Sequence, residues 1–458
     1  MAYALQALAV LAVVLALARP ARRAATLVRQ PPVIGEIALG LVVVPLLTAA
    51  AGPDLVGTLL PPPVTDHLHT VGLAGLALYL TGVGHSARPR RGELSPRAYG
   101  RLLAGSLLPG LLAGALLSVW VVWRDTPGER GTAPTAALVL LLAAAFAVTA
   151  VPVLARILTD RGIEDTTEGR LSLLVAVSID ALTWLVLTAA LAAAAEGGGR
   201  LMRALAVIAG GVVAAVLLRR LLGRAAVGRL CARRPAAAAF VLGAVAVAAA
   251  VATERAGLTA IFGAVLVGLA VPRDGEQGSR DEESGLRDGE PGSRDGESGV
   301  RTRVVRAVER CGLLFVPVFF VTAGLQVSTD GPDGFSWATF ALVLLLATAA
   351  KLGGGYAGAR LARLPAGTAL RFGVLMNTRG LTEIAVLQAG LSAAILSPGL
   401  FLALVLMALV TTAATGPLLS LTDRRRAAVG APARPTTGVP AQRATGAPPR
   451  PASEELSS

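Results

Sequence analysis

The sequence has 458 residues, of which 54% are hydrophobic and 4% aromatic, and its mean hydropathy of +0.66 is typical of a polytopic membrane protein rather than a soluble one. The net charge of +13 comes mostly from arginines between apolar runs, a pattern that indicates membrane topology and speaks against nucleic-acid binding. The sequence contains no Walker A, nucleophile-elbow or HExxH motif, so we do not expect an enzyme or an ATP-driven pump. We also expect no cofactor and no metal other than a transported cation.

Thirteen apolar segments follow one another along the chain, and we expect each to be a membrane-spanning helix. The fold class predicted is therefore an all-α polytopic membrane protein whose transmembrane domain covers residues 1–423. The segments are approximately 2–18, 31–51, 67–84, 99–122, 133–155, 170–195, 201–218, 236–252, 257–271, 309–328, 336–359, 366–391 and 398–420.

Arginines concentrate in the loops that follow segments 1, 3, 5, 7, 11 and 13, whereas the intervening loops hold few basic residues. Because basic loops stay in the cytoplasm, this alternation predicts an outside N-terminus and a cytoplasmic C-terminus. We expect a multi-pass protein of the cell membrane, surrounded by membrane lipid. The first apolar run lacks a basic residue before it, so we expect a retained span rather than a signal peptide.

An odd number of spans allows two six-span halves of opposite orientation around a linker span. Segments 5 and 12 are then equivalent, and both contain helix breakers at matching depth, in 148–152 and in 376–380. Proline and glycine weaken a helix, and interrupted helices at matching positions of two halves are a pointer to a transporter binding site. We therefore predict inverted six-helix repeats with two broken crossing helices.

Two segments have the composition of disordered chain. A tandem duplication of fourteen residues fills 273–300, and its glycine, serine and many charged residues predict a disordered cytoplasmic insert over 272–303. The tail, 424–458, is rich in Pro, Ala, Gly and Thr and is expected to be disordered as well. No nucleotide-binding βαβ pattern follows the last span, so any nucleotide regulation would have to come from a separate regulatory subunit.

Asp180 is the principal candidate for the chemistry of the chain. It lies near the middle of an apolar run that begins after Arg170, about 15 Å from that end at 1.5 Å per residue. A charged group at this depth is costly and is usually paired or functional. Asp180 either ties helices together or binds a proton and a cation in alternation. Thr183 shares its helical face and offers a further oxygen ligand.

Lys351 is the second intramembrane charge, in an otherwise uncharged run over 341–358. It lies too deep to reach the interface easily. Three roles stay open for it, namely pairing with an acid, neutralising the dipole ends of the broken helices, and carrying a proton.

Four further polar residues accompany the predicted spans. Glu36 follows Pro31, Pro32 and Gly35 and is expected to be a solvated or helix-terminus acid. Arg379 and Glu383 are one turn apart and can form an i,i+4 pair, either as a structural strut or as a cytoplasmic gate. Asn377 belongs to the second break and is grouped with these gating or structural residues. The four residues are Glu36, Asn377, Arg379 and Glu383.

These stretches, taken in order, resemble the monovalent cation:proton antiporter-2 family (CPA2), with its sodium/proton exchanger-type membrane domain. The resemblance implies a homodimer with a dimerisation domain and a mobile core domain, in which segments 5 and 12 cross. It also implies that Asp180 carries the exchanged ion, that Lys351 lies near it, and that Thr149 of the first break is among the ion- or proton-binding residues. The matching stretches are PVIGEI at 32–37, VTAVPVL at 148–154, IDALTW at 179–184, IFGA at 261–264, VPVFFVTAGL at 316–325, KLG at 351–353 and MNTRGLTE at 376–383.

The position before Asp180 departs from the family pattern, because members commonly have Asp or Asn there and this chain has Ile179. The resemblance thus implies a one-carboxylate antiporter that exchanges one monovalent cation, Na⁺ or K⁺, for one proton without net charge movement. Two alternatives stay open: an uncoupled, channel-like cation pathway on the same fold, and a membrane sensor or scaffold that does not transport.

Overall fold

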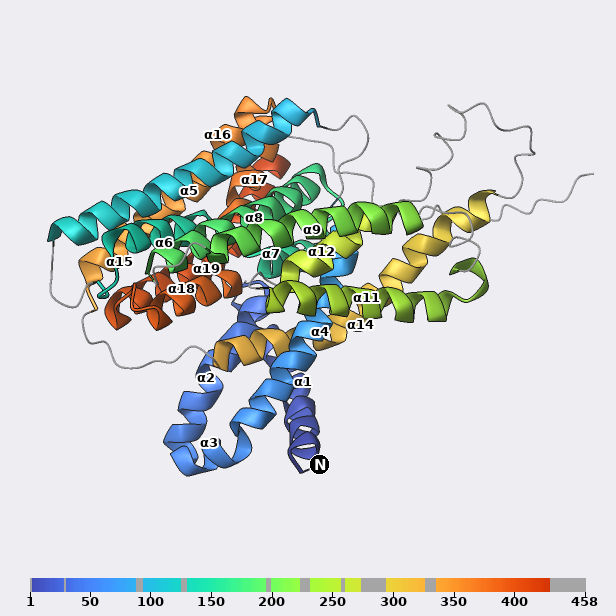
Figure 1. The fold of residues 1–458 in the computed structure, drawn as a ribbon, viewed down its shortest axis with the longest axis horizontal. Helices are drawn as coiled ribbons and strands as arrows, with labels where there is room; N and C mark the ends of the chain where they lie inside the picture. The colour runs from blue at the N-terminus through green and yellow to red at the C-terminus, as the bar shows by residue number, and fades with distance from the viewer. Residues whose placement is uncertain are drawn as a thin grey trace, which may run out of the picture.

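A computed structural model describes the chain as a bundle of helices (Figure 1). The described residues are 2–28, 30–87, 94–124, 130–194, 199–222, 231–256, 260–272, 294–325 and 335–428. Within them each of the thirteen predicted apolar segments contains at least one helix, which confirms the all-α class. The number of membrane crossings stays a prediction.

Up to residue 194, the described residues form the helices α1 (Ala2–Leu27), α2 (Pro32–Ala51), α3 (Pro53–Leu59), α4 (Pro62–Ser86), α5 (Pro96–Arg124), α6 (Thr135–Ala147), α7 (Val151–Asp160) and α8 (Thr167–Ala194). The rest comprises α9 (Gly199–Leu222), α11 (Pro235–Arg255), α12 (Ala260–Ala270), α14 (Arg294–Leu325), α15 (Trp337–Thr348), the π-helix η2 (Ala349–Gly353), α16 (Gly354–Leu361), α17 (Ala366–Met376), α18 (Leu381–Ser392) and α19 (Pro398–Ala428). Several begin at a proline, whose fixed φ suits the first helical turn.

Seven stretches of described helix are long and apolar enough to cross a membrane, and two shorter apolar helices, Ala260–Ala270 and Ala366–Met376, accompany them. The chain is therefore a multi-pass integral membrane protein. The seven are Tyr3–Leu27, Pro96–Arg124, Thr135–Asp160, Thr167–Ala194, Pro235–Arg255, Trp337–Leu361 and Pro398–Arg424.

Three details differ from the sequence-based predictions. Helix α14 begins at Arg294, so the last part of the insert predicted to be disordered, 294–303, is helical and continues into the apolar helix behind it. Helix α19 likewise continues to Ala428 and so takes up the first residues of the predicted tail. The remainders, 273–293 and 429–458, lie outside the described residues. The short helix α3 was not predicted.

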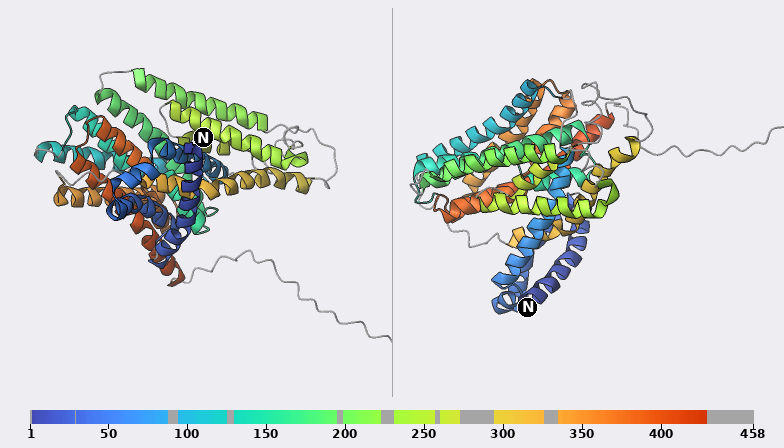
Figure 2. Two further views of the ribbon diagram at one scale, coloured as in Figure 1. Left: turned by 90° about the horizontal axis from the view of Figure 1, so that it is seen from below. Right: turned by 45° about the vertical axis from the view of Figure 1, so that its right-hand side comes forward.

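The helices form two groups that lie side by side (Figures 1 and 2). One group contains α1, α2, α4, α9, α11, α12 and α14, and the other contains α5 to α8 and α15 to α19. Glycines allow backbones to touch within each group. A Cβ on Gly312 of α14 would lie 2.3 Å from the backbone nitrogen of Tyr79 in α4, and one on Gly105 of α5 would lie 2.4 Å from Gly358 of α16.

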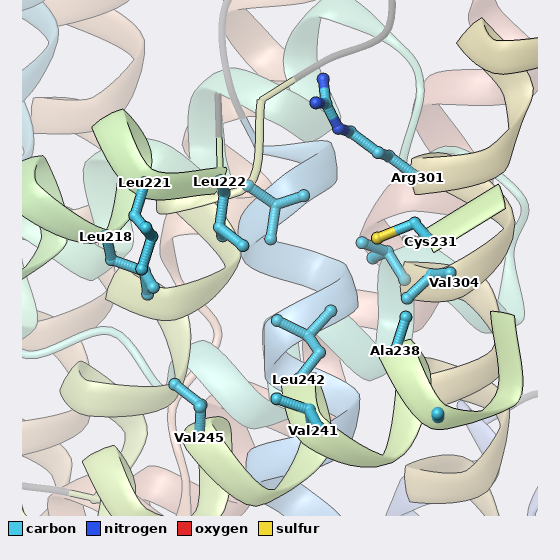
Figure 3. Close-up of a pocket in the computed structure, with 13 residues that line it drawn as sticks. Leu218, Leu221, Leu222, Cys231, Ala238, Val241, Leu242, Val245, Arg301 and Val304 are labelled. Carbon is cyan, nitrogen blue, oxygen red and sulfur yellow. The ribbon is translucent and has the colours of Figure 1, made fainter. Parts of the chain in front are cut away.

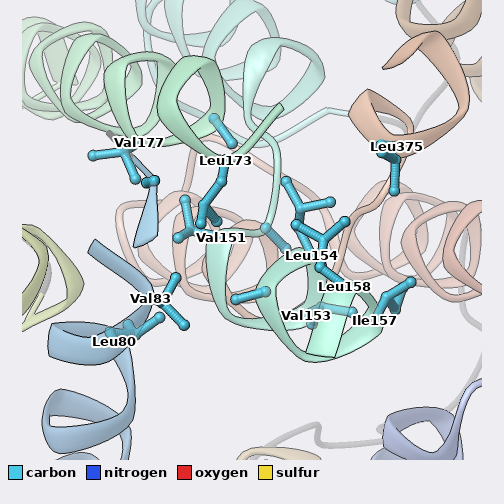
Figure 4. Packing of buried hydrophobic residues seen from close by; sticks show 14 of the residues in the cluster. Leu80, Val83, Val151, Val153, Leu154, Ile157, Leu158, Leu173, Val177 and Leu375 are labelled. Atoms are coloured by element: carbon cyan, nitrogen blue, oxygen red, sulfur yellow. The ribbon is translucent and has the colours of Figure 1, made fainter. Parts of the chain in front are cut away.

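Helix α7 lies where the two groups meet. Its apolar side chains, among them Val151, Leu154 and Ile157, belong to one buried cluster with Val83 of α4 and Leu375 of α17 (Figure 4). Helix α8 and further helices of both groups, among them α2, α12, α14 and α19, contribute the other members of the cluster. This half of the interrupted helix is thus surrounded by both groups. A movement of one group against the other must therefore change the contacts that α7 makes.

Candidate functional site

The two predicted breaks are present and touch each other. Helix α6 ends before an extended stretch, 148–150, and α17 ends before an unwound stretch, 377–380. The N–H of Ala150 donates to the carbonyl oxygen of Thr378 at 3.1 Å, and the Thr149 hydroxyl donates to the Met376 carbonyl at 3.1 Å. Gly380 has φ 146°, a conformation that glycine adopts without strain. The interrupted helices therefore cross and bond through their unwound backbone.

Lys351 lies at this crossing and is fully buried. Its Nζ donates to the carbonyl oxygen of Ala147, the last residue of α6, to Thr149 Oγ1 at 3.0 Å and to the Ser106 carbonyl at 3.5 Å. It projects from η2, and π-helical turns within α-helices occur frequently at functional sites. Of the three roles that the sequence left open for Lys351, this contact with the end of a broken helix corresponds to the second, the neutralisation of a helix dipole.

Arg379 binds the same helix end from the other break. Its guanidinium donates to the carbonyls of Ala145 at 2.8 Å and Phe146 at 3.0 Å, and lies 5.6 Å from the centre of the Phe146 ring. It also donates to Glu383 Oε1 at 2.6 Å, which confirms the predicted i,i+4 pair. Both side chains of the pair are fully buried.

Two cations therefore converge on the carboxyl end of α6. The last carbonyls of a helix have no partner within that helix and carry the negative end of its dipole. The carbonyls of Ala145, Phe146 and Ala147 are bonded instead by Arg379 and Lys351. This pairing satisfies an interrupted helix end inside the protein, where water would otherwise be needed.

Asp180 lies on α8, which packs against α6, α7 and α17, and its side chain is buried with 2% of its surface exposed. The preceding residue, Ile179, belongs to the apolar cluster that contains Ala150 and Met376 at the two breaks. The position where the family commonly has a second polar group is thus filled by apolar packing against the crossing.

Polar side chains without protein hydrogen bonds are buried near both breaks and on α8. Among the described residues no hydrogen-bond partner is found for Thr183 Oγ1, for either amide atom of Asn377, or for the hydroxyls of Thr378 and Thr382. All four side chains project from α8, the α17–α18 break or the start of α18. A buried polar atom without a hydrogen bond costs about 1–3 kcal/mol. The oxygens of this set are therefore suited to hold an oxygen-seeking cation, and the Asn377 amide nitrogen can donate to a water molecule. Thr149, by contrast, is engaged as donor and acceptor.

Glu36 lies in a separate charged network at the far end of α7. It is fully buried instead of solvated, and Arg22 Nε lies 3.5 Å and Arg156 Nη2 3.9 Å from its Oε1. Arg156 also pairs with Asp160 at 3.3 Å. The network joins α1 and α2 of one helix group to α7 of the other. Tyr79 of α4 adds a bond to Thr159 of α7 at 3.0 Å.

Sequence reasoning missed two parts of this arrangement. Thr412 of α19 holds the second break, because its hydroxyl accepts from the Arg379 N–H at 3.0 Å and donates to the Arg379 carbonyl at 2.6 Å. The cluster of threonines, Thr411, Thr412 and Thr415, in a mostly apolar span was the only signal of it. Arg156 and Asp160 were visible as an i,i+4 pair, but their link to Glu36 joins residues more than a hundred positions apart.

Comparison with known proteins shows which sequences and structures the chain is similar to. Residues 9–422 match the family described as sodium/hydrogen exchanger, transmembrane. The Na(+)/H(+) antiporter NhaS4 of Synechocystis sp. is 30% identical over 406 residues, which cover 85% of this chain and 90% of that protein. Cation/H(+) antiporter 20 of Arabidopsis thaliana is 31% identical over 412 residues, 85% of this chain but 45% of that protein, so the chain spans about half the length of this plant relative.

A solved structure shows the same fold. The sodium proton antiporter MjNhaP1 of Methanocaldococcus jannaschii matches with a TM-score of 0.58 at 16% identity. The match covers 93% of this chain and 96% of that one.

Proposed function

The chain belongs to the sodium/hydrogen exchanger family, and from this premise we propose that it is a secondary active antiporter that exchanges a monovalent cation, Na⁺ or K⁺, for protons by alternating access. The observation that supports this most directly is the crossing of two interrupted helices beside a buried carboxylate. In this proposal thirteen spans form two inverted six-helix repeats around the linker helix α9, and the interrupted helices α6–α7 and α17–α18 occupy equivalent positions in the two repeats.

Asp180 is the group that carries the exchanged ion. Its carboxylate binds either a proton or a cation, and the competition between them couples the two fluxes. We assign two further oxygens to the cation: Thr183 Oγ1, one helical turn from Asp180, and the side-chain oxygen of Asn377 at the second break. Both are buried and have no hydrogen-bond partner among the described residues, so a bound cation would offset the cost of leaving them unsatisfied.

Lys351 and Arg379 position this site without carrying the ion. Lys351 is the only lysine in a sequence with 42 basic residues, so arginine serves at every other basic position. An ammonium is a compact point charge with three donors, whereas a guanidinium is a planar fork. The converging acceptors at Ala147, Thr149 and Ser106 suit the ammonium, and we assign Lys351 a constant charge that holds the end of α6.

Exchange is electroneutral under this assignment. If Lys351 keeps its proton throughout, Asp180 is the only group whose charge changes, and it is neutralised equally by one cation or one proton. Ile179 supports this stoichiometry because it leaves no second acid at the neighbouring position.

We assign the network of Glu36, Arg22, Arg156 and Asp160 to gating. It bridges the two helix groups at one end of α7, so relative movement of the groups must break it. The protein would act as a homodimer in the cell membrane, with its N-terminus outside, its C-terminus and the 272–303 insert in the cytoplasm, and with any nucleotide regulation supplied by a separate subunit.

The test is flux in proteoliposomes under an imposed pH gradient, with Na⁺, K⁺, Li⁺ and Rb⁺ compared. The Asp180→Asn variant should lose cation-dependent proton release, while the matched variant Asp54→Asn, on the exposed end of α3, should keep it. Proton release that persists in Asp180→Asn would refute the carboxylate assignment. Cation flux without proton counterflow would indicate a channel, and no response to any cation would indicate a sensor or scaffold. A rate that depends on an imposed membrane potential would refute electroneutrality.

A further inference from the structure

An apolar pocket of about 270 Å³ lies far from the crossing, between one end of each of the helices α9, α11 and α14. Its walls are helical stripes, because Ala238, Val241, Leu242 and Val245 of α11 follow each other at the spacing of one helix face. This stripe is about 10 Å long. Val241 is 60% exposed and so marks the open side of the pocket. The remaining lining residues are Leu218, Leu221, Leu222, Cys231, Ala237, Val271, Arg301, Val304 and Val305.

Positive charge surrounds the same end of these three helices. Figure 3 shows Arg301 of α14 at one end of the pocket, next to Cys231. Other arginines lie in the last turn of α9, directly before α11, and along the first turns of α14. Such an excess of arginine predicts the cytoplasmic side of the membrane. These arginines are Arg219, Arg220, Arg233, Arg234, Arg303 and Arg306.

We propose that this pocket binds one anionic phospholipid of the cytoplasmic leaflet, with an acyl chain against the α11 stripe and the headgroup phosphate at Arg301. An apolar wall in a membrane protein is satisfied by any lipid chain, but a wall that ends at arginines favours a negatively charged headgroup. Guanidinium groups bind phosphate oxygens through paired hydrogen bonds. The site is separate from Asp180 and does not depend on the exchange reaction.

Cys231 provides a direct probe, because it lines the pocket and the sequence has only one other cysteine, Cys311. In a Cys311→Ser background, a neutral maleimide would be used to alkylate Cys231 in vesicles of phosphatidylcholine alone and in vesicles that contain phosphatidylglycerol. We expect alkylation to be about fivefold slower with phosphatidylglycerol, the effect of one arginine–headgroup contact. The reverse background, Cys231→Ser, reports on Cys311 outside the pocket, and its alkylation should not slow to the same degree.

Two arginine variants separate the pocket from the general surface charge. Arg301→Gln should abolish the slowing, whereas Arg303→Gln, which removes the same charge from an exposed position on the same helix, should leave it. Native mass spectrometry should show phosphatidylglycerol retained by the protein and by Arg303→Gln, but not by Arg301→Gln or by Ala238→Phe, which fills the pocket.

Three results would overturn the proposal. Equal alkylation in both kinds of vesicle would mean that another occupant, such as the acidic 273–293 insert or a second copy of the chain, covers the pocket. If alkylation of Cys231 is still slowed in Arg301→Gln, the effect comes from the general positive charge of the surface and not from the pocket. Protection by inorganic phosphate in detergent, without lipid, would indicate an anion site rather than a lipid site.

Discussion

Replacing Lys351 with methionine tests whether the crossing is held by a buried ammonium. Methionine has a similar length and flexibility but cannot donate, so the variant leaves the Ala147 carbonyl and Thr149 Oγ1 without this donor. Each unsatisfied buried acceptor costs about 1–3 kcal/mol. Because the variant also removes the desolvation penalty of a buried charge, we expect a net loss of about 2–4 kcal/mol in the free energy of unfolding. With an unfolding entropy of about 2.1 cal/mol/K per residue over the folded helices, the melting temperature should fall by about 3–5 °C.

The assay is thermal unfolding of the purified protein in a mild detergent, followed by intrinsic fluorescence. Arg360→Met is the matched control, since it removes a positive charge from the same span at an exposed position. A surface change of this kind should alter stability by no more than about 0.5 kcal/mol. The two variants differ in burial and in hydrogen bonds, and not in net charge.

Equal melting temperatures for Lys351→Met, Arg360→Met and the native chain would refute the claim that Lys351 holds the end of α6. Transport by the same variants gives the second readout. If Lys351 only positions the site, then exchange by Lys351→Met is slower but remains insensitive to membrane potential. A native protein that responds to potential, with the response lost in Lys351→Met, would show instead that the lysine carries a proton.

Two further predictions concern the surroundings of the crossing. Thr183→Val should raise the KM for the cation about tenfold, the effect of losing one oxygen ligand worth about 1.4 kcal/mol. The control is Thr188→Val on the same helix, whose hydroxyl donates to the Trp184 carbonyl and whose loss should leave the KM unchanged. An unchanged KM in Thr183→Val would show that Thr183 does not bind the cation. Arg379→Gln should destabilise the protein by about 3–5 kcal/mol, because Glu383 is left as an unpaired buried charge, and adding Glu383→Gln should recover part of that loss in thermal unfolding. Additive losses in this double-mutant cycle would contradict direct coupling of the pair.

Much of the fold could be predicted from the sequence because a bilayer leaves few alternatives. Runs of apolar residues long enough to cross it must be helical, since every backbone group has to bond internally. Helix breaks at 148–152 and 376–380 could be predicted because proline and glycine act locally. The Arg379–Glu383 pair could be predicted for the same reason, from a spacing of one helical turn.

Contacts between distant segments could not be predicted in this way. Sequence spacing does not say which carbonyls Lys351 reaches, and the burial of Glu36 depends on arginines from α1 and α7. Helicity at the end of the insert also escaped prediction, because a composition typical of disorder was overridden by continuity with the apolar part of α14.

Local sequence pattern is enough to predict that this chain spans a membrane, that two of its helices are interrupted, and that one carboxylate, Asp180, lies deep in an apolar run. The packing of the whole bundle was needed to show that the two interruptions contact each other, and that Lys351 and Arg379 both bind the carboxyl end of α6. The reason is physical: helix formation and breaking depend on neighbours within a few residues, whereas the partner of a buried charge is whichever helix end the packing of the whole bundle brings within 3 Å.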